Sequence, residues 1–194
     1  IDFDEIHCNF AKSITQGLGS EIAQRLMAKK KNILVVKGKK EYSPRTIEVL
    51  DKIKNNNIFN QILKVTCYDD MKYKPYGFFY DLISGIYGYS ITGKTKEQNN
   101  FAPFMGIDES NFVKDMINLN TREFPHPEDV RYGLFEIFET LISKMKNTLI
   151  FIENIEKMDD TSFELFQILL KKFDQYDISY LMFASKDFSL HKPA

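Results

Sequence analysis

An acidic residue at the end of an apolar segment is the first candidate for chemistry in this chain. Residues 148–152 carry no charge and are followed directly by Glu153. Such a segment is typical of a buried parallel strand, and open parallel sheets bind ligands at the edge where their strands end. A carboxylate at that edge can hold Mg²⁺ beside phosphate groups. The alternative is a buried strand after which Glu153 simply meets solvent.

A second candidate is a phosphate-binding motif at residues 88–95. Their sequence, GYSITGKT, satisfies the pattern G-x-x-x-x-G-K-T. That pattern binds phosphate when a buried strand precedes it and a helix follows it. Here residues 80–87 have the pattern of a helix end, and residues 96–103 form a poor helix. We therefore interpret the match as a coincidence in a loop, from which Lys94 could still reach a ligand.

The composition is that of an ordinary globular protein. The 194 residues are 43% hydrophobic and 27% charged, with a formal net charge of −1. This balance gives no strong field, so it predicts neither a nucleic-acid nor a membrane partner. The two cysteines, Cys8 and Cys67, can supply neither a disulfide framework nor a zinc site. We expect a cytoplasmic protein whose partners are other domains of the same protein or other proteins.

Apolar patterns predict that helices alternate with strands. The expected strands are residues 33–36, 61–67, 148–153 and 178–184. The expected helices cover residues 20–31, 43–58, 75–88, 130–145 and 161–173, with a further one near 111–119. The last main helix is expected to open with a capping box from Thr161 to Glu164. This alternation predicts a three-layer α/β/α fold with a mainly parallel sheet.

Four signals in a fixed order extend this prediction. They are a strand, loop and helix at residues 33–53; TCYD at 66–69 before PYGFF at 75–79; RYGLF at 131–135; and IEN at 152–154 before DDTS at 159–162. In order and spacing they resemble the P-loop ATPase module of the STAND group. That group is close to AAA+ proteins and occurs in maltose-regulator-type activators and beside soluble adenylyl cyclase domains. The resemblance implies a RecA-like core at residues 21–194 after an N-terminal extension at 1–20, with ATP or ADP and Mg²⁺ as cofactors.

The resemblance places the phosphate loop at residues 38–46, where the sequence departs from the family pattern. The family loop needs glycines for close backbone approach, a lysine for the phosphates and a hydroxyl for Mg²⁺. Gly38 fits the first glycine, but Ser43 replaces the last glycine and Arg45 replaces the hydroxyl. Pro44 replaces the lysine and removes a backbone N–H. Glu41 adds a like charge near the anion. The cofactor-binding residues implied by the resemblance are Gly38, Lys39, Lys40, Ser43, Arg45, Thr46 and Lys186.

The catalytic positions depart from the family as well. Glu153 takes the place of the metal-holding acid, with Thr46 as the second metal ligand. Asn154 stands in the catalytic position of the general base, and an amide cannot accept a proton at neutral pH. Lys186 and Ala184 stand where the family often has an Arg and a sensor Thr. General acid–base catalysis alone contributes roughly 10²–10⁴-fold, so these losses predict weak or absent hydrolysis.

We therefore expect a degenerate nucleotide-binding module, a pseudo-ATPase that serves a larger signalling protein as a regulator or scaffold. The chain begins without Met and stops after the last expected strand, which predicts a fragment without a fifth strand and truncated before the helical lid. Two alternatives stay open. One is an active ATPase whose non-standard phosphate site uses Lys94 or Arg45 with Glu153. The other is a pure protein-interaction domain that uses a sheet edge or the aromatic helix at residues 78–86.

Overall fold

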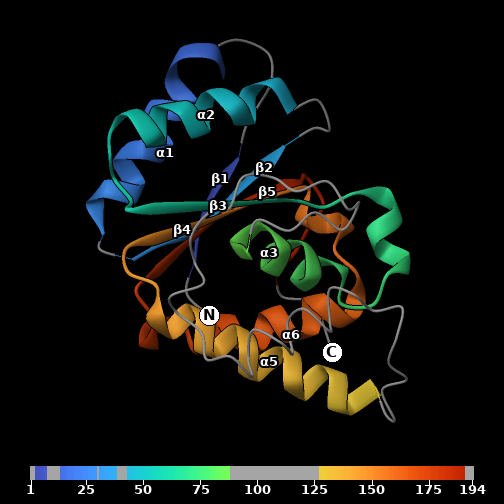
Figure 1. Cartoon of the computed structure of the whole chain (residues 1–194). Helices are drawn as coiled ribbons and strands as arrows, with labels where there is room; N and C mark the ends of the chain where they lie inside the picture. The colour runs from blue at the N-terminus through green and yellow to red at the C-terminus, as the bar shows by residue number, and fades with distance from the viewer. Residues whose placement is uncertain (1–2, 8–13, 30, 39–42, 88–126, 191–194) are drawn as a thin grey trace. The chain divides into compact units, whose positions relative to one another are not determined.

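A computed structural model describes residues 3–7, 14–29, 31–38, 43–87 and 127–190 (Figure 1). The described strands form one five-stranded, all-parallel sheet in the order β1-β2-β5-β4-β3. The strands are β1 (Asp4–His7), β2 (Ile33–Gly38), β3 (Gln61–Thr66), β4 (Thr148–Glu153) and β5 (Ile178–Ser185). The helices are α1 (Ile14–Ala28), α2 (Ser43–Asn55), α3 (Gly77–Tyr87), α5 (Pro127–Lys144) and α6 (Asp160–Lys171). The protein is therefore of the α/β class.

The chain divides into two compact units. The sheet unit comprises residues 1–67, 146–157 and 178–194, and so contains all the described strands with α1 and α2. The helical unit comprises residues 68–145 and 158–177, and contains α3, α5 and α6. Each unit is built from segments that are far apart in sequence.

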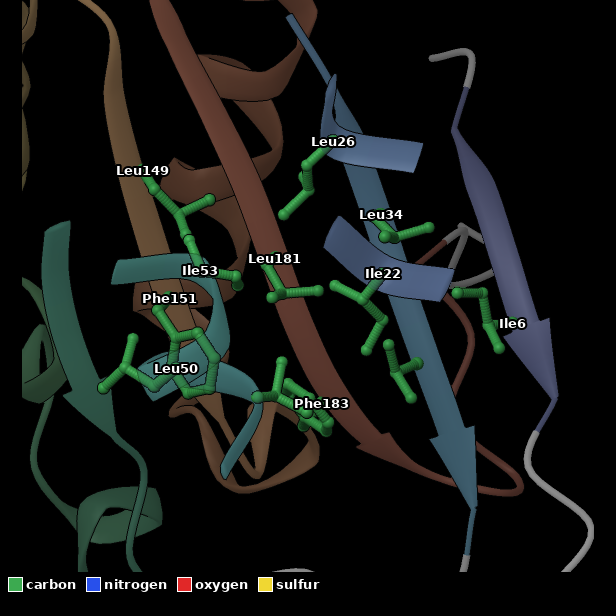
Figure 2. Close-up of a cluster of buried hydrophobic side chains, with 12 residues drawn as sticks. Ile6, Ile22, Leu26, Leu34, Leu50, Ile53, Leu149, Phe151, Leu181 and Phe183 are labelled. Atoms are coloured by element: carbon green, nitrogen blue, oxygen red, sulfur yellow. The ribbon is translucent and has the colours of Figure 1, made fainter. Parts of the chain in front are cut away.

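Helices α1 and α2 pack on one face of the sheet. Because strand side chains alternate between faces, every second residue of a strand points toward these helices. Figure 2 shows the resulting hydrophobic cluster, in which Ile22 and Leu26 of α1 and Leu50 and Ile53 of α2 lie against side chains of the strands. The strand side chains of the cluster include Ile6, Leu34, Leu149, Phe151, Leu181 and Phe183. This apolar layer fixes which face of α2 is turned toward the sheet.

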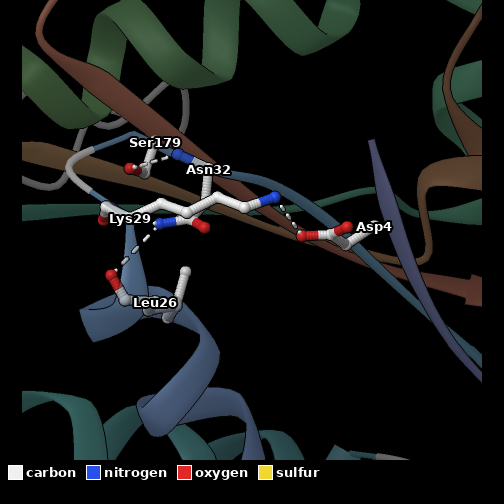
Figure 3. A network of polar contacts seen from close by, with 5 residues as sticks. All are labelled: Asp4, Leu26, Lys29, Asn32 and Ser179. Carbon is white, nitrogen blue, oxygen red and sulfur yellow. Dashed lines mark hydrogen bonds and ion pairs between the residues drawn. The ribbon is translucent and has the colours of Figure 1, made fainter. Parts of the chain in front are cut away.

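One buried asparagine joins the end of α1 to the starts of two strands (Figure 3). The Nδ2 group of Asn32 donates to the carbonyl oxygens of Leu26 and Lys29, both at 3.1 Å. The backbone N–H of Asn32 donates to Ser179 Oγ at 3.1 Å, and Lys29 Nζ lies 2.9 Å from Asp4 Oδ2. The last carbonyls of a helix have no partner within the helix, so Asn32 satisfies two groups that would otherwise be unpaired.

Aromatic residues form the core of the helical unit. The Phe78 ring lies 5.6 Å from the Phe166 ring of α6, and the Phe79 ring lies 5.2 Å from the Phe138 ring of α5, both edge to face. Phe78 and Phe79 are fully buried. Edge-to-face pairs at these separations are favourable beyond the area that they bury. The aromatic face of α3 is therefore part of a core rather than an exposed surface for a partner.

The structure confirms the four strands expected from the apolar patterns, and it places β2 beside β5. It corrects three details. A fifth strand exists, because Asp4–His7 pairs with β2 as an edge strand. Helix α1 begins at Ile14 rather than at residue 20. The capping box was wrong: the N-cap of α6 is Asp159, whose carboxylate accepts the backbone N–H of Ser162.

Several predictions fall on residues outside the described ranges. They are the motif at residues 88–95, the helix near 111–119, and the side chains of Lys39, Lys40 and Lys94. Among the described residues, no helix combines the length and the apolar character needed to cross a membrane.

Candidate functional site

Glu153 is the last residue of β4 and carries a buried carboxylate. Its side chain lies on the same face of the strand as those of Leu149 and Phe151, so it points to the face of the sheet that α1 and α2 cover. Only 7% of the residue is exposed to solvent. An ionised carboxylate at such a position is stable only when hydrogen bonds or opposite charges replace its lost hydration. The groups around Glu153 supply both.

Thr46 of α2 contacts Glu153 directly. The inward face of α2 contains Val49, Leu50 and Ile53, and Thr46 lies one turn before them on the same face. This position brings the buried Thr46 hydroxyl to the end of β4, where Oγ1 donates a hydrogen bond to Glu153 Oε1. The two residues are 107 positions apart in sequence. The fold therefore brings together the two side chains expected to share a metal ion.

Strand β3 adds two residues that the sequence reasoning missed. Thr66 stands opposite Glu153 in the ladder, and its Oγ1 donates to Glu153 Oε2 at 2.6 Å. Lys64 stands opposite Phe151, and its Nζ lies 3.0 Å from the same Oε2. The sequence signal that could have found them is the two-residue spacing of positions 62, 64 and 66, which places all three side chains on one face of the strand. We call Thr46, Lys64, Thr66 and Glu153 the Glu153 cluster.

The Glu153 cluster offers few ligands for Mg²⁺. A carboxylate has about four acceptor positions, and three of them here receive the two hydroxyls and the ammonium. Mg²⁺ prefers free carboxylate and water oxygens in octahedral geometry. The described residues contain no group of three or more His, Cys, Asp or Glu side chains that could hold a metal. The donor set around Glu153 fits an ammonium better than it fits Mg²⁺.

Asn154 has a backbone role at this edge of the sheet. Its φ is 55°, in the left-handed region that Asn adopts more readily than most residues. Its side-chain Nδ2 donates to the carbonyl oxygen of Cys67 at 3.4 Å, and its own carbonyl accepts from Lys157 N at 2.8 Å. Asn154 thus reverses the chain after β4 and ties that turn to the end of β3.

The ends of β2 and β5 lie beside each other at the same edge. Gly38 is the last residue of β2 and pairs with Ser185, the last residue of β5. The backbone N–H of Ser185 donates to Glu156 Oε2 at 3.1 Å. Lys186 follows Ser185 and is exposed to solvent. Glu156, which lies two residues after Asn154, is therefore bound to the backbone of β5.

The remaining residues of the expected phosphate loop are placed only in part. Helix α2 begins at Ser43, as the Ser43-Pro44 pair predicts, so the backbone of Ser43 and Arg45 lies in its first turn. Their side chains, like Lys39 and Lys40, lie outside what the structure describes. The first turn of a helix presents unpaired N–H groups that favour an anion. Here Pro44 removes one of them.

The helical unit has a separate polar centre at the start of α6. Asp159 is buried, and its Oδ1 accepts from Tyr76 N at 2.9 Å, Ser162 N at 2.8 Å and Thr161 Oγ1 at 2.5 Å. Tyr76 has a φ of 61°, so Asp159 holds a strained backbone position. Burial, with smaller effects from the charges of Tyr76 and Asp159, raises the pKa of Tyr80 to about 12. Asp159 is thus an anchor for the loop before α3.

Neither a protein-family model, nor a curated protein, nor a solved structure matches this chain.

Proposed function

We propose that this chain is a degenerate nucleotide-binding module of the STAND/AAA+ P-loop type. It would act in the cytoplasm as a regulatory or scaffold part of a larger signalling protein, with weak or absent ATP hydrolysis. The observation that carries the proposal is the hydrogen bond between Thr46 and Glu153. Its partners would be other domains of the same protein or other proteins.

The contact supports the proposal because of what a P-loop site requires. In such enzymes a hydroxyl at the helix start and an acid at a strand end serve the same phosphate-bound cation, so the two must be neighbours. Thr46 and Glu153 meet this requirement although the sequence separates them widely. The strand order is also compatible with a RecA-like fold, since β5 separates the strand before the expected loop from the strand that carries the acid.

The groups near Glu153 support weak rather than efficient hydrolysis. A general base must accept a proton from the attacking water, and Asn154 is an amide whose Nδ2 is bound to Cys67 O. Glu156 lies two residues after Asn154, and its Oε2 already accepts from Ser185 N. A missing base alone lowers the rate of such a step by roughly 10²–10⁴-fold.

The test is calorimetric titration of ATP and of ADP into the wild type, Thr46→Val and Glu153→Gln. Thr46→Val removes the hydroxyl at the start of α2, and Glu153→Gln removes the charge that holds this hydroxyl and the Lys64 ammonium in place. We therefore expect each variant to weaken nucleotide binding by about tenfold, or 1.4 kcal/mol. The matched control is Glu48→Gln, an exposed residue of the same helix, which should leave binding unchanged.

Two results would contradict the proposal. If titration up to millimolar nucleotide released no heat, the chain would not bind nucleotide, and only a scaffold role would remain. Rapid ATP hydrolysis that Glu153→Gln abolishes would show an active enzyme instead of a degenerate one.

A further inference from the structure

Lys64 is an exposed residue of β3, which lies at the edge of the sheet beside β4. It lies in the middle of β3, and its Nζ is 3.0 Å from Glu153 Oε2 and 6.0 Å from the centre of the Phe151 ring. About a third of its side chain is exposed, whereas that of Glu153 is 9% exposed. The ammonium therefore approaches a nearly buried carboxylate from the edge of the sheet.

The charge of Glu153 needs a cation. Thr46 and Thr66 donate hydrogen bonds to it but carry no charge. In the part of the chain that the structure describes, Lys64 is the cation paired with Glu153. A buried carboxylate without an opposite charge is strongly unfavourable, and a bound metal ion is one common solution. Here a side chain of the protein already provides the positive charge.

From this geometry we infer that Lys64 takes the place of the divalent cation at Glu153, so that the site binds its anionic ligand without Mg²⁺. Where the anionic ligand is a nucleotide, the inference rests on the proposed function. Two cations beside one carboxylate repel each other, and this repulsion is strong where burial lowers the effective dielectric constant. The ammonium of Lys64 therefore excludes Mg²⁺ from Glu153. Removing that ammonium should open the carboxylate to a divalent ion.

The first experiment uses the metal alone and needs no nucleotide. Mn²⁺ is titrated into the folded wild type, Lys64→Met and the double variant Lys64→Met/Glu153→Gln, and free Mn²⁺ is measured by electron paramagnetic resonance. We expect Lys64→Met to bind Mn²⁺ at least about tenfold more tightly than the wild type, and the double variant to lose that gain. The control is Lys54→Met, which removes the same charge from an exposed position of α2 and should behave as the wild type.

Equal Mn²⁺ binding by the wild type and a folded Lys64→Met variant would overturn the inference. A gain that persists in the double variant would overturn it too, since the ion would then lie elsewhere. Lys64→Arg keeps a cation at this position and should exclude Mn²⁺ as the wild type does. Tight Mn²⁺ binding by Lys64→Arg would contradict the exclusion even if Lys64→Met failed to fold.

The second experiment uses the wild type alone. ATP is titrated in the presence of MgCl₂ and again in the presence of EDTA, and we expect similar dissociation constants. ATP binding that disappears in EDTA would overturn the inference while leaving the proposed function intact. The absence of ATP binding under both conditions would contradict the proposed function, and the Mn²⁺ titration would still decide the role of Lys64.

Discussion

Replacing Asp159 by Ala should destabilise the protein markedly. Asp159 Oδ1 accepts hydrogen bonds from Ser162 N, at the start of α6, and from Tyr76 N. Loss of an N-cap costs about 0.5–2 kcal/mol. A buried N–H left without a partner costs about 1–3 kcal/mol, and the low end applies to Tyr76 because Thr161 Oγ1 also lies 3.2 Å from its nitrogen.

One effect opposes these losses. Among the described residues, Asp159 Oδ2 has no hydrogen-bond partner although it is buried, so Ala also removes an incompletely paired charge. The two losses add to about 1.5–3 kcal/mol, and the opposing effect lowers the net loss in the free energy of unfolding to about 1–2.5 kcal/mol. With a urea dependence of about 2 kcal/mol per molar, the unfolding midpoint should fall by about 0.5–1.2 M. Far-ultraviolet circular dichroism during a urea titration measures this shift.

The neighbouring Asp160 provides the matched control. It has the same side chain in the first turn of α6 but is exposed. An exposed carboxylate there contributes about 0.3–1 kcal/mol, so Asp160→Ala should cost less than Asp159→Ala. Asp159→Asn keeps an acceptor for both N–H groups and should be milder than Asp159→Ala. If Asp159→Ala cost no more than Asp160→Ala, the assignment of Asp159 as cap and anchor would be refuted. If Thr161→Ala lowered the free energy of unfolding more than Asp159→Ala does, Thr161 would be the N-cap, as the sequence predicts.

Three further predictions concern backbone conformation and pH. Asn154→Ala should lower the free energy of unfolding by about 1–2 kcal/mol more than Asn154→Gly, because the φ of 55° at this position is unfavourable for a residue with a Cβ. Thermal unfolding of the two variants measures this difference. Burial raises the pKa of Asp81, and the charge of Lys74 opposes this effect. The ionised carboxylate therefore lowers the stability of the fold once the pH rises above its unfolded pKa of 3.8. Asp81→Asn should raise the Tm at pH 7 and lose this advantage near pH 3. Hydrogen bonds from Lys172 and Tyr176 lower the pKa of Glu139, which adds stability above pH 4.5 that disappears as pH falls through the lowered value. The Tm difference between the wild type and Glu139→Gln should therefore shrink on acidification.

The central strands were predictable because burial on both sides removes charge from their sequences. Each residue of β4 and nearly every residue of β5 is buried, and both segments are apolar runs. Strand β1 has no such signal. Of its four residues only Ile6 is buried, and its acidic residues suit an edge that meets water. A short edge strand is defined by its partner β2 rather than by its own composition.

The Glu153 cluster was predictable only where one element sufficed to place a residue. Glu153 follows from the end of an apolar strand, and Thr46 was expected from the resemblance to the P-loop family, at the start of a predicted helix. The contacts of Lys64 and Thr66 with Glu153 depend on the register between β3 and β4. This register joins distant segments, since Thr66 and Glu153 are 87 positions apart. No local pattern determines that register, so the counter-ion of Glu153 could not be identified from the sequence.

The position of β5 in the middle of the sheet has a consequence for synthesis of the chain. Among the described strands, β1 pairs with β2 and β3 with β4, and β5 alone joins these two pairs. Asn32 and Ser179, at the start of the junction, are 147 residues apart. Until residues 178–185 leave the ribosome, each pair exposes an unpaired strand edge, and isolated two-stranded pairs are marginally stable. A nascent chain that stops before residue 178 is therefore expected to need a chaperone or to aggregate, whereas completion of β5 closes the sheet in one step.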